Sequence, residues 1–408
     1  MTRNALVALI LMLTAAGAWA QTPGEPLPSW SPGFMDLHQI NTGQGNAAFF
    51  IFPDGTTMLL DAGSGTPDPP KGTLPRPDAS RSPGEWVVRY IRHMTGASAL
   101  DYGYLSHFHS DHLGTLVPTS KTSASGTYRL SGLVEVGDQI PIRKMIDRGW
   151  PDYSYQLRSN DPVIANYRAF LQWQVEHNHM KVERFQPGRN DQIVLAQDPG
   201  RYPNFEVRNI AGNGEVWTGA AANTRQVFPP VDALLPEDRP GENKLSLAIR
   251  ISYGKFDYFN GADIEGIPAP GAPHWLDIET PVAMAVGPVE AAILNHHGNR
   301  NAMNAFFVST LRPQVYIIPV WSSDHPGHDV LDRMYSTRLY PGPRDVFATN
   351  MKQSNKEVIG NLLTRLKSDQ GHILVRIEPG GARFHVIILD DASESYRVKS
   401  VHGPYESR

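Results

Sequence analysis

Ser106-His107-Phe108-His109-Ser110-Asp111-His112-Leu113-Gly114 is the stretch of the sequence that says most about the fold. It follows Leu100–Leu105, an apolar and aromatic run typical of a strand. His107 and His109 lie at i and i+2, so on extended backbone their side chains point the same way. Asp111 and His112 can then turn toward a second point about 3.5–4 Å away, the spacing of two-metal hydrolases. Imidazole nitrogens and carboxylate oxygens suit zinc, so the stretch predicts a metal site rather than a histidine-rich surface loop.

Composition sets the broad class of the protein. The chain has 408 residues, of which 40% are hydrophobic and 19% are charged, an ordinary globular balance. The net charge of −4 gives no sign of a basic nucleic-acid-binding surface. The sequence contains no cysteine, which excludes disulfides, thiolate metal ligands and a cysteine nucleophile.

The first twenty residues have the pattern of a cleavable targeting signal. Arg3 supplies the positive charge, Ala5–Thr14 is a short apolar run, and Ala18–Ala20 resembles an A-x-A cleavage site. The run is too short to indicate a transmembrane span, and no other long apolar stretch occurs. We therefore expect residues 1–20 to be removed and the mature protein to be periplasmic or secreted, with no membrane association. The proline-rich residues 21–33 are expected to form a flexible lead-in.

Alternating apolar residues and turn signals predict a run of strands at the start of the domain. Residues 35–40, 47–52 and 56–60 read as strands, the last two joined by Pro53-Asp54-Gly55 and ending at Asp61-Ala62-Gly63. The remaining expected strands are 100–105, 193–196, 205–210, 243–251, 256–259, 289–295, 314–319, 373–377 and 384–389. The expected helices are 85–94, 163–185, 330–339 and 357–366.

Three stretches of the sequence carry a family resemblance. The run H-F-H-S-D-H at residues 107–112 resembles the signature of the metallo-β-lactamase superfamily. The sequence from His38, H-x-I-x-x-G-Q-G-x-A, and that from Pro53, P-D-G-x-T-x-L-L-D-A-G, resemble the hydrolase domain of bacterial competence (DNA-uptake) channel proteins and phosphorylcholine esterases. The resemblance implies an α+β fold, a four-layer αββα sandwich, over residues 34–390. Asn46 departs from the pattern, because those domains usually have aspartate there.

Further matches to the same subfamily imply the rest of the metal site. The run from Asn243, N-x-x-S-L, followed by y-G-x-F-x-Y-F-x-G-x-D, ends at Asp263, which the resemblance makes the carboxylate that bridges two metals. His296-His297-Gly298 matches an H-H-G motif, in which His297 is expected to be the ligand and His296 its neighbour in the cleft. His325 lies in a segment that resembles the late H-P element of these domains and is expected either to face the cleft or to be a turn residue.

The expected centre holds two zinc ions, with manganese or iron as alternatives. The first metal is assigned to His107 and His109, and Asp263 forms the bridge. The second metal is assigned to Asp111, His112 and His297. Asp111, His297, His296 and His325 are the expected catalytic group. Water between two such metals has a pKa near 7 and supplies hydroxide at neutral pH.

Several positions remain open between a functional and a structural role. Asp61 is either a carboxylate that orients a ligating histidine or a turn residue, and His38 is expected in the core. His177 and His179 are the histidines between the first motif and Asp263, and on a helix they cannot both reach one metal. We expect both to face solvent.

The domain is expected to carry insertions at about 115–160 and 211–242 and to end in a tail at 391–408. The first insertion contains Tyr128, Trp150, Tyr153 and Tyr155, which either pack in the core or form an aromatic wall beside the metals. The second should cover the active-site end, with Trp217 as a candidate contact.

The resemblance favours a metal-dependent hydrolase that acts on phosphoric esters, with a small-molecule or phosphodiester substrate and no stable nucleic-acid partner. Hydrolysis of a β-lactam or lactone, or metal-dependent binding without catalysis, are the alternatives. The natural substrate and the oligomeric state do not follow from the sequence.

Overall fold

The computed structural model describes residues 21–65, 71–155 and 161–408. The expected signal peptide at residues 1–20 lies outside the described residues, as do 66–70 and 156–160. Within the described ranges, no helix combines the length and the apolar character needed to cross a membrane.

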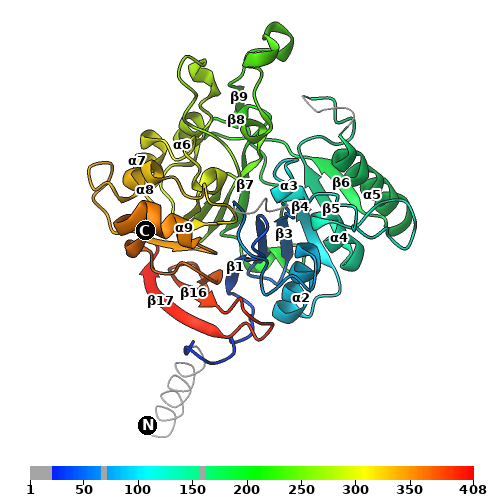
Figure 1. Ribbon diagram of the computed structural model, residues 1–408, viewed down its shortest axis with the longest axis horizontal. Coiled ribbons are helices and arrows are strands. Elements are labelled where there is room, and N and C mark those ends of the chain that lie inside the picture. Colours follow the sequence, from blue (N-terminus) through cyan, green and yellow to red (C-terminus); the bar gives the residue numbers. More distant parts are fainter. Residues whose placement is uncertain (1–20, 66–70, 156–160) are drawn as a thin grey trace, which may run out of the picture.

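The chain has mixed α and β structure built on two large mixed sheets (Figure 1). The first sheet has nine strands in the spatial order β17-β16-β15-β1-β2-β3-β4-β5-β6. Its strands are β1 (Met35–Gln39), β2 (Ala47–Ile51), β3 (Thr57–Ala62), β4 (Leu100–Tyr104), β5 (Ile142–Asp147), β6 (Lys181–Arg184), β15 (His372–Ile377), β16 (Arg383–Leu389) and β17 (Val398–Glu406). Pairing is antiparallel from β17 to β3 and parallel from β3 to β6.

The second sheet has eight strands in the order β14-β13-β12-β11-β10-β7-β8-β9. Its strands are β7 (Phe205–Gly212), β8 (Glu215–Trp217), β9 (Thr224–Gln226), β10 (Ala248–Tyr253), β11 (Phe256–Asn260), β12 (Ala291–Ile293), β13 (Val315–Ile318) and β14 (Asp345–Ala348). Strands β11 to β14 are parallel, whereas β11, β10, β7, β8 and β9 pair in antiparallel fashion.

The α-helices lie at the two sides of the pair of sheets in Figure 1. The helices next to the first sheet are α2 (Pro83–Thr95), α3 (Ser110–Leu113), α4 (Gly132–Gln139) and α5 (Pro162–Asn178). Those next to the second are α6 (Glu279–Val286), α7 (Ala305–Leu311), α8 (His328–Tyr335) and α9 (Gln353–Ile359). Short 3₁₀ turns occur at 199–201, 231–233, 236–238, 242–245, 274–276, 295–298 and 360–365.

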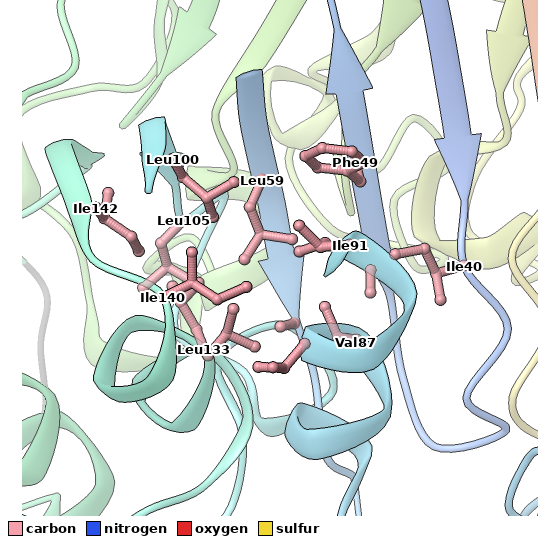
Figure 2. Packing of buried hydrophobic residues seen from close by; sticks show 14 of the residues in the cluster. Ile40, Phe49, Leu59, Val87, Ile91, Leu100, Leu105, Leu133, Ile140 and Ile142 are labelled. Carbon is pink, nitrogen blue, oxygen red and sulfur yellow. The ribbon is translucent and has the colours of Figure 1, made fainter. Parts of the chain in front are cut away.

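Three apolar clusters hold these elements together. One lies between the sheets, where Phe50 of β2 meets Tyr258 of β11 with ring centroids 6.0 Å apart. A second joins the first sheet to α2, α4 and α5, and Figure 2 shows Val87 and Ile91 of α2 facing Leu59 of β3. The third joins the second sheet to α6, α7 and α8. The sheets therefore pack against each other, and helices cover the outer face of each.

This arrangement brings the carboxyl ends of two sets of parallel strands to one edge of the molecule. Parallel neighbours end on the same side of their sheet. The segments after β3 and β4 come from the first sheet, and those after β11, β12 and β13 come from the second. The backbone NH of Leu247 donates to the carbonyl of Ser106 at 3.0 Å and links the two edges.

Most of the expected elements are present, but one expected strand is absent and several boundaries differ from those expected. The helix expected over 163–185 ends at Asn178, because His179 takes a left-handed conformation with φ of 56° and a strand, β6, follows. Residues 193–196 are not a strand, and Val194 is instead held by the Tyr102 hydroxyl. The strand expected from residue 243 starts at Ala248, after a 3₁₀ turn. Residues 357–366 form the end of α9 and a 3₁₀ turn rather than one helix.

Two regions that the sequence set apart belong to the main sheet. Residues 115–160 are not a plain insertion, since they contain α4 and β5, and β5 is the neighbour of β4. The aromatic residues there mostly pack: Tyr128 and Tyr153 are buried, and Tyr153 lies against Phe108. Residues 391–408 are not a free tail, because β17 pairs with β16 along its length. The lead-in is also attached, through a hydrogen bond from the NH of Gly24 to the Val398 carbonyl.

His38 is a core residue, as expected, and it belongs to a buried pair of histidines that both contact Tyr90 of α2. Its Nδ1 lies 2.9 Å from the Tyr90 hydroxyl, and the ring of His372 packs on Tyr90 at a centroid distance of 4.6 Å. Asp36 lies beside His38 but is held by the guanidinium of Arg376 at 2.6 and 2.9 Å. The effect of burial therefore outweighs that of the Asp36 charge. Burial lowers the pKa of His38 to about 4 and that of His372 to about 3.

We expect the metal-free protein to become less stable as the pH falls from about 6.5 to 4. In that range a histidine in the unfolded chain binds a proton, whereas buried His38 does not, so the unfolded state gains stability. His38 lowers the free energy of unfolding by at most about 3 kcal/mol, and this full loss is reached only when the pH is below the pKa of His38 in the folded protein. Urea unfolding at pH 7 and pH 4.5 measures how much free energy of unfolding is lost between the two pH values. This loss should be smaller in His38→Gln than in wild type, whereas the exposed control His93→Gln should behave like wild type. An equal loss in wild type and His38→Gln would contradict this assignment.

Candidate metal centre

The signature stretch lies at the end of β4, where Asp61 holds it in place. Asp61 is the second-last residue of β3 and has a positive φ of 59°, and its carboxylate accepts hydrogen bonds from the NH and the hydroxyl of Ser106 at 2.8 and 2.7 Å. Gly63 passes close to the same loop, because a Cβ there would lie 1.8 Å from the Asp111 carbonyl oxygen. The Asp-Ala-Gly motif is therefore a support for the loop that carries the histidines.

Four buried side chains from three parts of the chain meet beside this loop: Asp111, His112, Asp263 and His297. The His297 Nε2 lies 3.0 Å from the Asp111 Oδ2 and 3.3 Å from the His112 Nε2. The His112 Nε2 lies 3.1 Å from the Asp263 Oδ1. Ligands 2.0–2.1 Å from a tetrahedral zinc are about 3.3 Å apart, so these separations fit one metal ion.

A second group lies next to the first and shares Asp263 with it. It consists of His107, His109 and Asp263. The His107 Nε2 lies 3.2 Å from the His109 Nδ1 and 3.7 Å from the Asp263 Oδ2. His107 is fully buried, whereas His109 is exposed and lines the cleft.

Asp263 divides its two oxygens between the groups. Its Oδ1 faces His112 and His297, at 3.1 and 3.5 Å, while its Oδ2 faces His107. Asp263 is 2% exposed, so its carboxylate has little access to water. A carboxylate placed in this way can bridge two cations.

Hydrogen bonds at the far ring nitrogens fix how the imidazoles face the centre. The His112 Nδ1 lies 2.7 Å from the Asp61 Oδ2, and the His297 Nδ1 donates to the Pro319 carbonyl at 2.9 Å. Each bond assigns the proton to Nδ1 and leaves the Nε2 lone pair for a metal. Of the two roles open for Asp61, the geometry gives it both: it orients His112 and stabilises the turn.

Asn46 fits the same arrangement, although aspartate was expected there. Its Nδ2 donates to the Asp61 Oδ2 at 3.1 Å, and its Oδ1 accepts from the Gln39 side chain at 2.9 Å. An aspartate in this position would place a second carboxylate against Asp61. The amide removes that repulsion.

The ionised carboxylates of the cluster favour the binding of cations. Burial opposes the ionised forms of Asp111 and Asp263, but His112 and His297 hold both pKa values well below the usual range. Burial also opposes the charged form of His112, but the carboxylates of Asp263, Asp111 and Asp61 raise its pKa well above the usual value. Burial lowers the pKa of His107. Three buried carboxylates, those of Asp61, Asp111 and Asp263, thus lie in or beside the cluster, and bound cations would balance their negative charge.

His297 is placed by a strained turn. His296 and His297 have φ of 46° and 53°, left-handed values that non-glycine residues seldom adopt. The buried carboxylate of Glu279 stabilises this turn. It accepts hydrogen bonds from the Asn295 side chain at 2.7 Å and from the NH groups of Met303 and Asn304 at 2.6 Å. Backbone strain of this kind at a site is a reason to look for function there.

His296 lies beside the centre and outside both groups, as expected. Its Nε2 is 3.9 Å from the Asp263 Oδ2 and 3.1 Å from the Asn243 Nδ2, and its Nδ1 is 2.7 Å from the Asn301 Oδ1. Its ring therefore positions Asn243, whose buried Oδ1 has no partner among the described residues.

His325 also faces the cleft, which has a volume of about 350 Å³. Its ring stacks on His297 with centroids 4.7 Å apart, and Trp321 packs edge-on against it. Burial lowers the pKa of His325 to about 3, so the ring is neutral near neutral pH. Within the described part of the chain, its Nδ1 has no hydrogen-bond partner. Of the two roles open for this residue, the placement favours the cleft.

A largely buried ion pair behind the signature was not predicted from the sequence. Arg148 follows β5 and is 1% exposed, and its guanidinium lies 4.8 Å from the Phe108 ring and forms two hydrogen bonds with Glu242. The same Glu242 carboxylate accepts from the NH of Phe108 at 2.8 Å. The pair thus holds the residue between His107 and His109. The only available signal was the expectation that residues 211–242 reach the active-site end.

Other candidates lie away from the centre. His177 and His179 are exposed on α5 and at its end, as expected. Trp217 does not line the metal cleft, and its indole is covered by Arg208 at 5.0 Å.

No protein-family model matches the chain, and no curated protein matches it significantly.

Proposed function

We propose that the chain is a two-metal hydrolase of the metallo-β-lactamase superfamily, with the four-layer sandwich of that family and an exported mature form. The observation that carries this proposal is Asp263, whose two oxygens face two separate groups of metal-ligand side chains. The order of these groups along the chain is the one that the resemblance implies. The packing of helices on the outer face of each sheet supports the fold assignment.

The donor set favours zinc, with manganese or iron as alternatives, because it offers imidazole nitrogens and carboxylate oxygens only. His107 and His109 would hold the first ion, Asp111, His112 and His297 would hold the second, and Asp263 would contribute to both. When bound, two such ions lower the pKa of water toward 7 and stabilise negative charge on the substrate.

Phosphodiester hydrolysis is the proposed reaction. Water adds to phosphorus, one P–O bond breaks, and the alcohol leaves with a proton. Besides the subfamily resemblance, the exposed amine of Lys71 at the cleft supports an anionic substrate. His325, His296 and Asn243 line the cleft, and the His296 ring contacts the Asn243 amide. We assign these side chains to substrate contact and proton transfer.

The proposal is tested with three substrate classes. The zinc-loaded protein should hydrolyse bis(p-nitrophenyl) phosphate and should lose this activity on chelation and regain it with zinc. Nitrocefin and a panel of lactones, assayed under the same conditions, should react slowly or not at all. Hydrolysis of the carbonyl substrates alone would overturn the phosphoester assignment, and a fully metal-loaded protein that is inert toward all three would overturn the enzyme assignment.

A further inference from the structure

A second hollow continues the metal cleft outward. Its volume is about 390 Å³, and it shares Lys71 and Asp324 with the cleft that contains the centre. Arg300, the start of α8 and the end of α9 also line it. A substrate bound at the metals thus has room to extend in one defined direction.

Arg300 lines this outer hollow and differs from the other arginine nearby in having no acidic partner among the described residues. It is exposed, and within the described residues its guanidinium takes part in no salt bridge or hydrogen bond, in contrast to Arg333, which pairs with Asp329 on α8 at 2.9 Å. Lys71 is likewise exposed and forms no salt bridge within the described part of the chain, although its charge helps to lower the pKa of Asp324, which lines the same hollow. Two cations, Arg300 without a salt bridge and Lys71 near Asp324, therefore line the hollow next to the metal cleft.

The backbone at Arg300 is anchored to the metal centre. Arg300 follows the His296–Gly298 turn, and the NH of Gly327 donates to the Gly298 carbonyl at 2.8 Å. A Cβ on Gly327 would lie 2.8 Å from the Arg300 Cγ, so the stem of the side chain rests on that glycine. The opposite wall contains Val358, which is 85% exposed, and gives an apolar surface beside the charges.

From this arrangement we propose that the substrate carries a second oxyanion, a phosphate or a carboxylate, beyond the bond that is cut, and that Arg300 and Lys71 bind it. A guanidinium binds phosphate or carboxylate through two parallel hydrogen bonds, which an ammonium group does not provide. The inference rests on the proposed hydrolase function and adds the substrate's second charge to it.

Three p-nitrophenyl esters test this inference: thymidine 5′-(p-nitrophenyl phosphate) and its derivatives with a 3′-phosphate or a 3′-succinate. All release the same chromophore from the same bond, and only the last two carry a second oxyanion. Wild type should show a KM about tenfold lower for at least one of these two, and which of them it prefers identifies the oxyanion. Arg300→Ala should raise the KM for that substrate by about tenfold more than it raises the KM for the parent ester. Arg300→Lys should keep part of the preference.

Arg338→Ala is the matched control, because Arg338 is also exposed but lines neither hollow. Metal content and the midpoint of thermal unfolding confirm that each variant is folded, and Lys71→Ala tests the second cation. Failure of wild type to cleave any of the three esters would contradict the proposed function. Cleavage of all three with equal KM, or an equal effect of Arg300→Ala on all three, would overturn the second-oxyanion inference alone.

Discussion

Replacement of Asp263 by alanine is expected to lower the metal content below two ions per chain and to abolish hydrolysis. The variant removes a ligand atom from both groups at once, because Oδ1 faces His112 and Oδ2 faces His107. Loss of a side chain that only supports a metal ligand usually weakens metal binding by 10–100-fold. Loss of a shared ligand should exceed about 100-fold. Elemental analysis after dialysis and a competition assay with a chromogenic chelator measure the change.

Two further variants separate the bridge from a general loss of charge. Asp263→Asn keeps the shape and one oxygen donor but not the negative charge, and it should retain one ion more readily than two. Asp369→Ala removes an exposed carboxylate that pairs with Lys356, and it should leave metal content unchanged. Two tightly held ions in Asp263→Ala would refute the bridging assignment.

Replacement of Arg148 by methionine is expected to destabilise the protein by about 3–5 kcal/mol and to weaken metal binding at the His107–His109 group. Removing one member of a buried ion pair leaves the other charge without a partner, and this costs about that much. Here the remaining charge is Glu242, which also holds the NH of Phe108. Denaturant unfolding of the metal-free protein gives the stability, and zinc titration gives the affinity.

The exposed pair Arg89–Glu394 provides the comparison. Its side chains are 39% and 40% exposed, so Arg89→Met should cost only about 0–1 kcal/mol. The double variant Arg148→Met/Glu242→Leu removes both charges of the pair and should recover part of the lost stability. A loss below about 1 kcal/mol in Arg148→Met would show that the buried pair contributes little.

The sequence was most informative where the chemistry is local. The signature ligands lie within six positions, and their direction follows from two residues of extended backbone and a short helix. The positions of Asp263 and His297 came from the family resemblance, and the structure brings both to the signature.

The sequence was less informative where structure depends on distant partners. Strand β5 has the sequence IRKMID, in which two cations interrupt the apolar pattern, and only its place between β4 and β6 makes it a strand. Strand β17 contains a Gly-Pro pair that reads as a turn. The contact between Arg148 and Glu242 joins residues 94 positions apart and leaves no local pattern.

The two edges that supply the ligands belong to different sheets, and this has a mechanical consequence. His107 and His112 follow a strand of the first sheet, whereas Asp263 and His297 follow strands of the second. An ion held by both would act as a cross-link between the two halves of the molecule. Many exported proteins obtain such a cross-link from a disulfide, which a chain without cysteine cannot form.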